Sequence, residues 1–107
     1  MILSTLPTLD AAAFADGVET GITLVEFGTR WCPPCKVLLP ILEELQRDEA
    51  GRLSVYQVDC DASPELAARY GVMSTPMVIL FRDGEPVERL LGLRPKGVYE
   101  AALARYF

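Results

Sequence analysis

The sequence predicts an α/β protein in which one mixed β-sheet carries helices on both faces. Short apolar, β-branched segments alternate with segments whose apolar residues recur at helical spacing, which is the pattern of β-α-β units with parallel strands. Near the C-terminus, two strand-like segments flank Asp83-Gly84, a dipeptide typical of hairpin turns between antiparallel strands. The chain has 107 residues, half of them apolar, and is expected to form a single domain over residues 1–107.

Four segments in the first sixty residues establish this pattern. Leu3 to Leu6 is a weak candidate strand and Asp10 to Val18 a candidate helix, and this first pair is expected to be a small appendage. Thr23 to Phe27 and Leu53 to Asp59 are rich in β-branched and apolar residues and predict two strands. Because a helix connects these two strands, they should lie parallel and be joined by a right-handed crossover.

The connecting helix begins at two prolines. Pro33 is expected at the cap and Pro34 at the first helical position, where a missing N–H costs nothing. Pro40 lies inside the helical pattern and is expected to kink the helix rather than end it. Gly51 is expected to end it. The apolar stripe that predicts this helix consists of Leu38, Ile41, Leu42 and Leu45.

The second half of the chain is expected to add a short helix, a hairpin and a terminal helix. Ser63, followed by a proline and a glutamate, predicts a capped helix that ends at Gly71. Met77 to Phe81 and Val87 to Leu91 are the strands of the hairpin, and Pro86 favours an edge position for the second of them. The terminal helix carries one apolar stripe: Val98, Tyr99, Ala102, Leu103 and Tyr106.

The composition excludes several classes of function. Lys and Arg total 10 against 15 Asp and Glu, and the resulting net charge of -5 is unfavourable for binding nucleic acid or anionic membranes. The apolar runs fall far short of the ~20 residues that span a bilayer. The N-terminal segment lacks the basic and apolar regions of a signal peptide. The protein is therefore expected in the cytoplasm, where structural disulfides are rare.

Cys32 and Cys35 lie between a predicted strand and a predicted helix, with two prolines between them. A zinc site needs about four Cys or His ligands, whereas the chain has no His and one further cysteine, Cys60. A structural disulfide that closes so short a loop would remove little unfolded-state entropy. Two buried thiols that pack as small apolar groups are another alternative. A redox pair is favoured over all three, because a helix N-terminus stabilises a thiolate.

Two long stretches resemble the thioredoxin family. The stretch LVEFGTRWCPPCKVLLPILEEL is similar to the active-site segment of that family, in which a strand leads into W-C-G-P-C-K and a helix kinked by proline. The stretch YGVMSTPMVILFRDGEPVERLLG is similar to the second half of the family, in which a small residue and a cis-proline precede a strand, a turn and an edge strand. The resemblance covers nearly the whole chain and implies the thioredoxin fold, a central mixed β-sheet flanked by helices on both faces.

The resemblance implies roles for named residues. Cys32 matches the attacking thiolate and Cys35 the resolving thiol of a redox-active disulfide, and Glu26 stands where the family has a buried Asp that accepts a proton. Pro76 matches the cis-proline that packs against the dithiol, and the backbone of Thr75 matches the segment that pairs with a bound substrate. Five further residues complete the implied substrate-binding surface: Trp31, Pro33, Pro34, Met73 and Gly92.

Four residues at or near the cysteines depart from the family pattern: Glu26, Gln57, Gly28 and Pro33. The apolar strand neighbours of Glu26 favour a buried acid with a raised pKa over a strand-end glutamate in water. Gln57 stands where a lysine is common, so Glu26 would keep its proton to a higher pH, unless Gln57 is simply a polar strand residue. Gly28 stands where a tryptophan is common. Either neighbours fill that space or the site is looser, and a glycine that eases a strand end is an equal alternative.

Pro33 and Cys60 are interpreted individually. Pro33 replaces the usual glycine between the cysteines, as in tryparedoxin-like and nucleoredoxin-like proteins, and its rigid φ should alter the balance between dithiol and disulfide. Cys60 lies between Asp59 and Asp61. Because acidic neighbours disfavour a thiolate, Cys60 is interpreted as a small half-buried residue rather than a regulatory thiol.

These observations predict a thiol–disulfide oxidoreductase that reduces protein disulfides by dithiol exchange. The expected protein is a monomer that takes electrons from a separate reductase, flavin- or ferredoxin-linked by family analogy, and no metal or tightly bound organic cofactor is implied. One alternative is a dedicated disulfide oxidant or a cytochrome-maturation-type reductase, which the missing export signal disfavours. Another is a non-catalytic binding module, which the intact cysteine pair disfavours.

Overall fold

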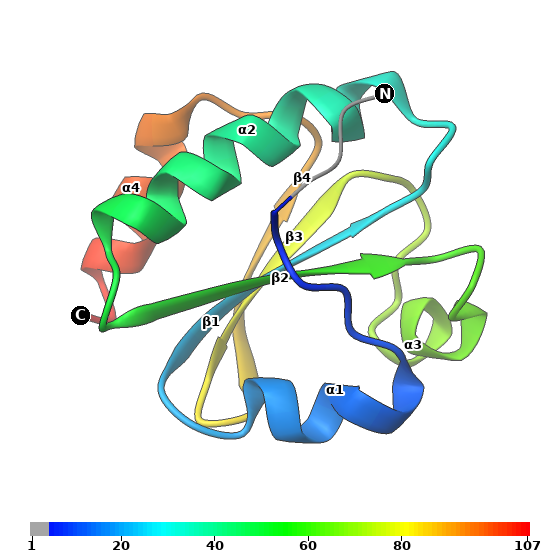
Figure 1. The fold of residues 1–107 in the computed structure, drawn as a ribbon, viewed down its shortest axis with the longest axis horizontal. Coiled ribbons are helices and arrows are strands. Elements are labelled where there is room, and N and C mark those ends of the chain that lie inside the picture. Colours follow the sequence, from blue (N-terminus) through cyan, green and yellow to red (C-terminus); the bar gives the residue numbers. More distant parts are fainter. Residues whose placement is uncertain (1–4) are drawn as a thin grey trace.

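The computed structural model describes residues 5–107, in which four helices and four strands form. The helices are α1 (Ala11–Val18), α2 (Pro33–Asp48), α3 (Pro64–Arg69) and α4 (Lys96–Ala104), and the strands are β1 (Ile22–Gly28), β2 (Leu53–Asp59), β3 (Met77–Arg82) and β4 (Glu85–Leu91). Helices α2 and α4 cover one face of the sheet, and α1 and α3 cover the other (Figure 1). The predicted α/β architecture is confirmed. None of these helices is long and apolar enough to cross a membrane.

The four strands form one mixed sheet in the order β2-β1-β3-β4. Strand β1 is parallel to β2, as the intervening helix requires, and antiparallel to β3, which forms the predicted hairpin with β4. The hairpin turns at Asp83 and Gly84, whose φ values of 50° and 85° are the positive values that a tight two-residue turn needs. Strand β4, which contains Pro86, lies at an edge of the sheet, and this prediction is also confirmed.

Each face of the sheet has its own apolar core. The face beneath α2 and α4 includes Leu24 of β1, whereas the opposite face includes Val25 and Phe27. Because alternate side chains of a strand point to opposite faces, Glu26 and Gly28 belong to the same face as Leu24. This alternation directs a carboxyl group toward the helix that begins at the two cysteines.

The N-terminal segment differs from the predicted strand. Residues 3 and 4 of that strand lie outside the described residues, and residues 5 and 6 are not in a strand. The segment instead makes one isolated parallel bridge, between Thr8 and Gln57 of β2. The Leu9 N–H donates to the Gln57 carbonyl at 2.9 Å, and the Gln57 N–H donates to the Pro7 carbonyl at 2.9 Å. Pro7 has no N–H to donate, which limits the ladder that this segment can form with β2.

Helix α1 is part of the core, and the prediction that it forms an appendage is wrong. The side chain of Phe14 is only 1% exposed. Its ring centroid lies 5.2 to 6.3 Å from the rings of three aromatic residues that are distant in sequence: Phe27, Tyr70 and Phe81. The pattern of the N-terminal segment predicts a helix but contains no information about these partners.

The helix ends differ slightly from those predicted. Cys32, and not Pro33, is the N-cap of α2, and the two prolines occupy its first two helical positions. The reason is that the Cys32 sulfur accepts a hydrogen bond from the Cys35 N–H, as a capping side chain does, while neither proline has an N–H to satisfy. Helix α2 continues through Pro40 and ends at Asp48, three residues before Gly51. Helix α4 ends at Ala104, before Tyr106 of the predicted stripe.

Candidate active site

Cys32 and Cys35 form a disulfide at the N-terminus of α2, with their Cα atoms 5.2 Å apart. The Cys35 N–H donates to the Cys32 sulfur at 3.2 Å. Both this N–H and the positive end of the helix dipole favour negative charge on the Cys32 sulfur. Cys32 is 9% exposed and Cys35 3% exposed, so Cys35 is the deeper of the two. The two sulfurs therefore have different surroundings, and Cys32 is the better placed to exist as a thiolate.

Glu26 is buried under α2. It is 2% exposed, and its carboxyl oxygen Oε2 has no hydrogen-bond partner among residues 5–107. Burial raises the pKa of Glu26 from 4.5 to about 8, because the charged form loses its hydration. The burial and the raised pKa agree with the interpretation of Glu26 as a buried acid and not with a strand-end glutamate in water. Its role as a proton acceptor stays a prediction.

The side chains of Glu26 and Cys35 both come close to Gly28. A Cβ atom at this position would have Glu26 Oε2 as its nearest neighbour and the Cys35 sulfur at 3.0 Å. The carboxyl group and the Cys35 sulfur therefore both lie next to Gly28. The space left by the missing side chain is thus occupied in part by the longer acid, which agrees with the alternative in which a neighbour fills it.

A cavity of about 840 Å³ opens beside this group. Its wall includes Glu26, Gly28, Cys35, Trp31 and Gln57. Gln57 is the Cα partner of Glu26 in the parallel pairing of β1 with β2, and its side-chain amide donates to the Leu6 carbonyl at 3.0 Å. A neutral amide thus stands beside the acid, and the carboxylate form gains no ion pair from this position.

The segment around Pro76 lies at the same end of the sheet as the disulfide. The Thr75–Pro76 peptide bond is cis, as the resemblance implied. The next residue, Met77, pairs with Phe27 at the end of β1 that leads to the cysteines. The Gly92 N–H donates to the Pro76 carbonyl at 2.8 Å, and Gly92 has a φ of 83°, a conformation that favours glycine. The structure therefore brings Pro76 and Gly92 together.

The remaining predicted substrate-binding residues are exposed. Trp31 is 77% exposed and Met73 95% exposed, and Pro33 and Pro34 are exposed as well. Exposed apolar side chains that gather into one patch are typical of interaction surfaces. Trp31 lines the cavity next to Glu26, whereas neither Met73 nor Pro76 does. The cavity and the Pro76 segment are thus two separate parts of the surface near the disulfide.

Cys60 is a half-buried free thiol that follows β2. Its N–H donates to the Gly28 carbonyl at 2.9 Å. Burial raises the pKa of Cys60 to about 11, and the negative charges of Glu26, Asp59 and Asp61 add to this effect. The thiol is therefore protonated at neutral pH, which agrees with its interpretation as an unreactive residue. The sequence pattern predicted the effect of the two flanking acids but missed the larger effect of burial.

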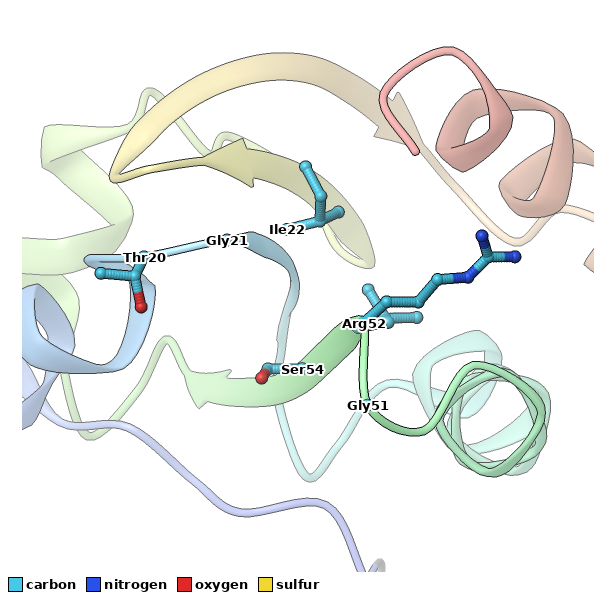
Figure 2. A pocket seen from close by; sticks show the side chains of 7 residues that line it. Thr20, Gly21, Ile22, Gly51, Arg52 and Ser54 are labelled. Atoms are coloured by element: carbon cyan, nitrogen blue, oxygen red, sulfur yellow. The ribbon is translucent and has the colours of Figure 1, made fainter.

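A second hollow, of about 290 Å³, lies at the opposite end of β1 and β2, near Ile22 and Ser54 (Figure 2). Its charged wall residue, Arg52, extends away from Ser54 in Figure 2 and pairs with Glu49 at 2.9 Å. The cysteines follow the other end of β1. This hollow therefore contributes nothing to the chemistry of the disulfide.

A disulfide that caps a helix beside a buried acid can be opened and closed by thiol exchange, and this geometry defines a thiol–disulfide oxidoreductase.

The thioredoxin family model matches residues 5–105 of the chain. A thioredoxin of Staphylococcus saprophyticus subsp. saprophyticus is 45% identical over 83 residues, which cover 78% of this chain and 80% of the relative. A thioredoxin of Staphylococcus aureus strain Mu50 is 46% identical over 85 residues, which cover 79% of this chain and 82% of the relative. The chain belongs to the thioredoxin family and is a thiol–disulfide oxidoreductase. Membership of this family implies disulfide-containing protein substrates and a reductase partner.

Proposed function

We propose that the protein works in the reducing direction, as a single cytoplasmic domain and a monomer, and that it receives electrons from a flavin- or ferredoxin-linked reductase. The observation that carries the proposal is the unequal placement of the two sulfurs. The Cys32 sulfur accepts a hydrogen bond at a helix N-terminus, while the Cys35 sulfur lies beside the Glu26 carboxyl group over Gly28. This asymmetry supports one thiol that attacks and another that resolves.

In the proposed cycle, the Cys32 thiolate attacks one sulfur of a substrate disulfide. The substrate S–S bond breaks, a mixed disulfide forms, and the other substrate sulfur leaves as a thiolate. Cys35 then loses its proton to ionised Glu26 and attacks the Cys32 sulfur, which releases the second substrate thiolate. The substrate gains two electrons and the protein becomes the Cys32–Cys35 disulfide. A pKa of about 8 lets Glu26 accept and return a proton near neutral pH.

The proposed docking surface lies around the cis-proline. The exposed side chains of Trp31 and Met73 would cover apolar parts of the substrate. The backbone of Thr75 would pair with an extended substrate strand, and the hydrogen bond from Gly92 to Pro76 supports a fixed position for that segment. Pro33 and Pro34 would form the exposed rim above the disulfide.

A coupled turnover assay tests the proposal. The protein is incubated with a protein disulfide and with either an NADPH-dependent flavin reductase or a ferredoxin-linked reductase, and substrate thiols are counted over time. We expect continuous turnover with one of them, and none for the double variant Cys32→Ser/Cys35→Ser. Light scattering of the same sample should report a monomer. If chemically reduced protein transfers no electrons to the substrate, the proposed direction is wrong, and if oxidised protein forms substrate disulfides efficiently, the dedicated oxidant is the better description.

A further inference from the structure

We propose that Gly28 is a positioning residue, whose missing side chain lets the longer acid Glu26 lie against Cys35. The inference rests on the proposed role of Glu26 in resolving the mixed disulfide. The proposal gives the glycine a function of its own, because the longer side chain of Glu26 occupies the space that a side chain at position 28 would need. A substitution at one of the two positions should therefore disturb the other. Positions 26 and 28 should therefore behave as one unit in resolution of the mixed disulfide.

The geometry begins with the pleat of β1. Residues 26 and 28 project from the same face of the strand, about 7 Å apart along it, and Glu26 reaches that distance by lying over Gly28. A Cβ on Gly28 would come closer to Glu26 Oε2 than van der Waals contact allows, and it would stand 3.0 Å from the Cys35 sulfur. Gly28 is not among the glycines with positive φ. An alanine at position 28 therefore suits the strand backbone and acts through its contacts with Glu26 and Cys35.

Of the two side chains that a Cβ would meet, that of Glu26 is the one free to move. Cys35 is anchored in α2, and in the oxidised protein it is also bonded to Cys32. The Glu26 oxygen Oε2 ends a flexible side chain and has no hydrogen-bond partner in the described part of the chain. The cavity of about 840 Å³ borders both Glu26 and Gly28 and offers the carboxyl group a place to go. An added methyl group should push the acid into this cavity and away from the Cys35 sulfur.

Displacement should change the chemistry of the acid as well as its distance from sulfur. A carboxyl group that gains water in the cavity loses part of its desolvation, so its pKa should fall from about 8 toward 4.5. Seven other ionisable groups line the cavity or act electrostatically with Glu26: Arg30, the Cys35 thiol of the reduced protein, Lys36, Glu43, Asp59, Cys60 and Tyr99. The added Cβ would contact Glu26 and Cys35, so a shifted pH profile would report the coupled titration of that carboxyl group and that thiol.

The test compares Gly28→Ala, Glu26→Asp and the double variant in single-turnover reduction of a protein disulfide. Samples are quenched with acid, and the mixed disulfide is counted by mass spectrometry between pH 6 and pH 9. We expect Gly28→Ala to resolve the mixed disulfide on the order of tenfold to a hundredfold more slowly, with its pH midpoint lowered. The double variant should resolve the mixed disulfide at a rate within about threefold of that of Glu26→Asp alone, because the shorter acid avoids the added methyl group.

Gly97→Ala is the matched control, because Gly97 lies in α4 with open space around its Cβ position. It should resolve at the wild-type rate. Two outcomes would overturn the proposal: a Gly28→Ala variant as fast as the wild type, or a double variant whose loss is the product of the two single losses.

Unfolding measurements keep the proposal testable if Gly28→Ala folds poorly. In urea, Glu26→Asp should then restore the stability of the alanine variant, and an absence of restoration would overturn the proposal. If the proposed role of Glu26 in resolution is wrong, a different set of results is expected. Glu26→Gln would then resolve as fast as the wild type, while the unfolding measurements would still show coupling between positions 26 and 28.

Discussion

Glu26→Gln should abolish a pH dependence of stability that the buried acid creates in the oxidised protein. The folded state keeps the Glu26 proton up to a pKa of about 8, whereas the unfolded chain releases it near the ordinary value of ~4.3. A raised folded pKa means that the unfolded state loses its proton first. The contribution of this residue is therefore most favourable below pH ~4.3, and the free energy of unfolding falls as the pH rises to about 8.

The size of the effect follows from the two pKa values. Each pH unit between them costs about 1.4 kcal/mol, so the penalty is roughly 4 kcal/mol at pH 7 and levels off at roughly 5 kcal/mol above pH 8. Glutamine keeps the shape of the side chain and carries no charge. Its buried amide costs on the order of 1 to 3 kcal/mol, but this cost is the same at every pH. The difference in stability should therefore move by roughly 4 kcal/mol in favour of the variant between pH 5 and pH 9.

Urea unfolding of oxidised samples at pH 5, 7 and 9, followed by circular dichroism, measures this difference. Glu100→Gln is a suitable control, because Glu100 is exposed on α4, and its difference from the wild type should stay small at all three pH values. The Glu26 variant should also resolve mixed disulfides more slowly, because Cys35 loses its proton acceptor. A stability difference that is constant from pH 5 to pH 9 would refute the account of Glu26 as a buried acid.

Three further substitutions test separate parts of the account. Phe14→Ala should lower the free energy of unfolding in urea by about 3 to 5 kcal/mol, because the ring is buried among three others; a loss below about 1 kcal/mol would restore the view of α1 as an appendage. Cys60→Ser should leave steady-state turnover nearly unchanged, because its thiol is protonated at neutral pH; a large loss with intact folding would show a role for this thiol. Gln57→Lys places an ammonium group beside Glu26, so it should lower the pKa of that acid and move the pH profile of resolution to lower pH; an unshifted profile would contradict the proposed pairing.

Local patterns were enough to predict the sheet and the direction of Glu26. The apolar run from Thr23 to Phe27 specifies a buried strand, and a helix between two strands requires that they be parallel. The contacts of α1 could not be predicted in the same way. The partners of Phe14 come from β1, β3 and the residue after α3, and no local pattern encodes which distant rings meet.

At the site, the cysteine pair and the acid could be predicted because each has a chemical signature in the sequence. The proposed positioning role of Gly28 could not be predicted, because it depends on the conformation of the Glu26 side chain. A usable signal was nevertheless present. A glycine two residues after a buried acid, on the same face of one strand, leaves room for that acid to lie along the strand.

Trapping of the mixed disulfide tests the division of labour between the two sulfurs most directly. Reduced Cys35→Ser and Cys32→Ser are each mixed with an oxidised protein substrate, the reaction is stopped with acid, and covalent adducts are mapped by mass spectrometry. The double variant Cys32→Ser/Cys35→Ser, which keeps Cys60, controls for adducts at the third cysteine. The account predicts an adduct through Cys32 in the Cys35→Ser variant and almost none in the Cys32→Ser variant. Equal trapping by both variants, or trapping through Cys35 alone, would contradict it.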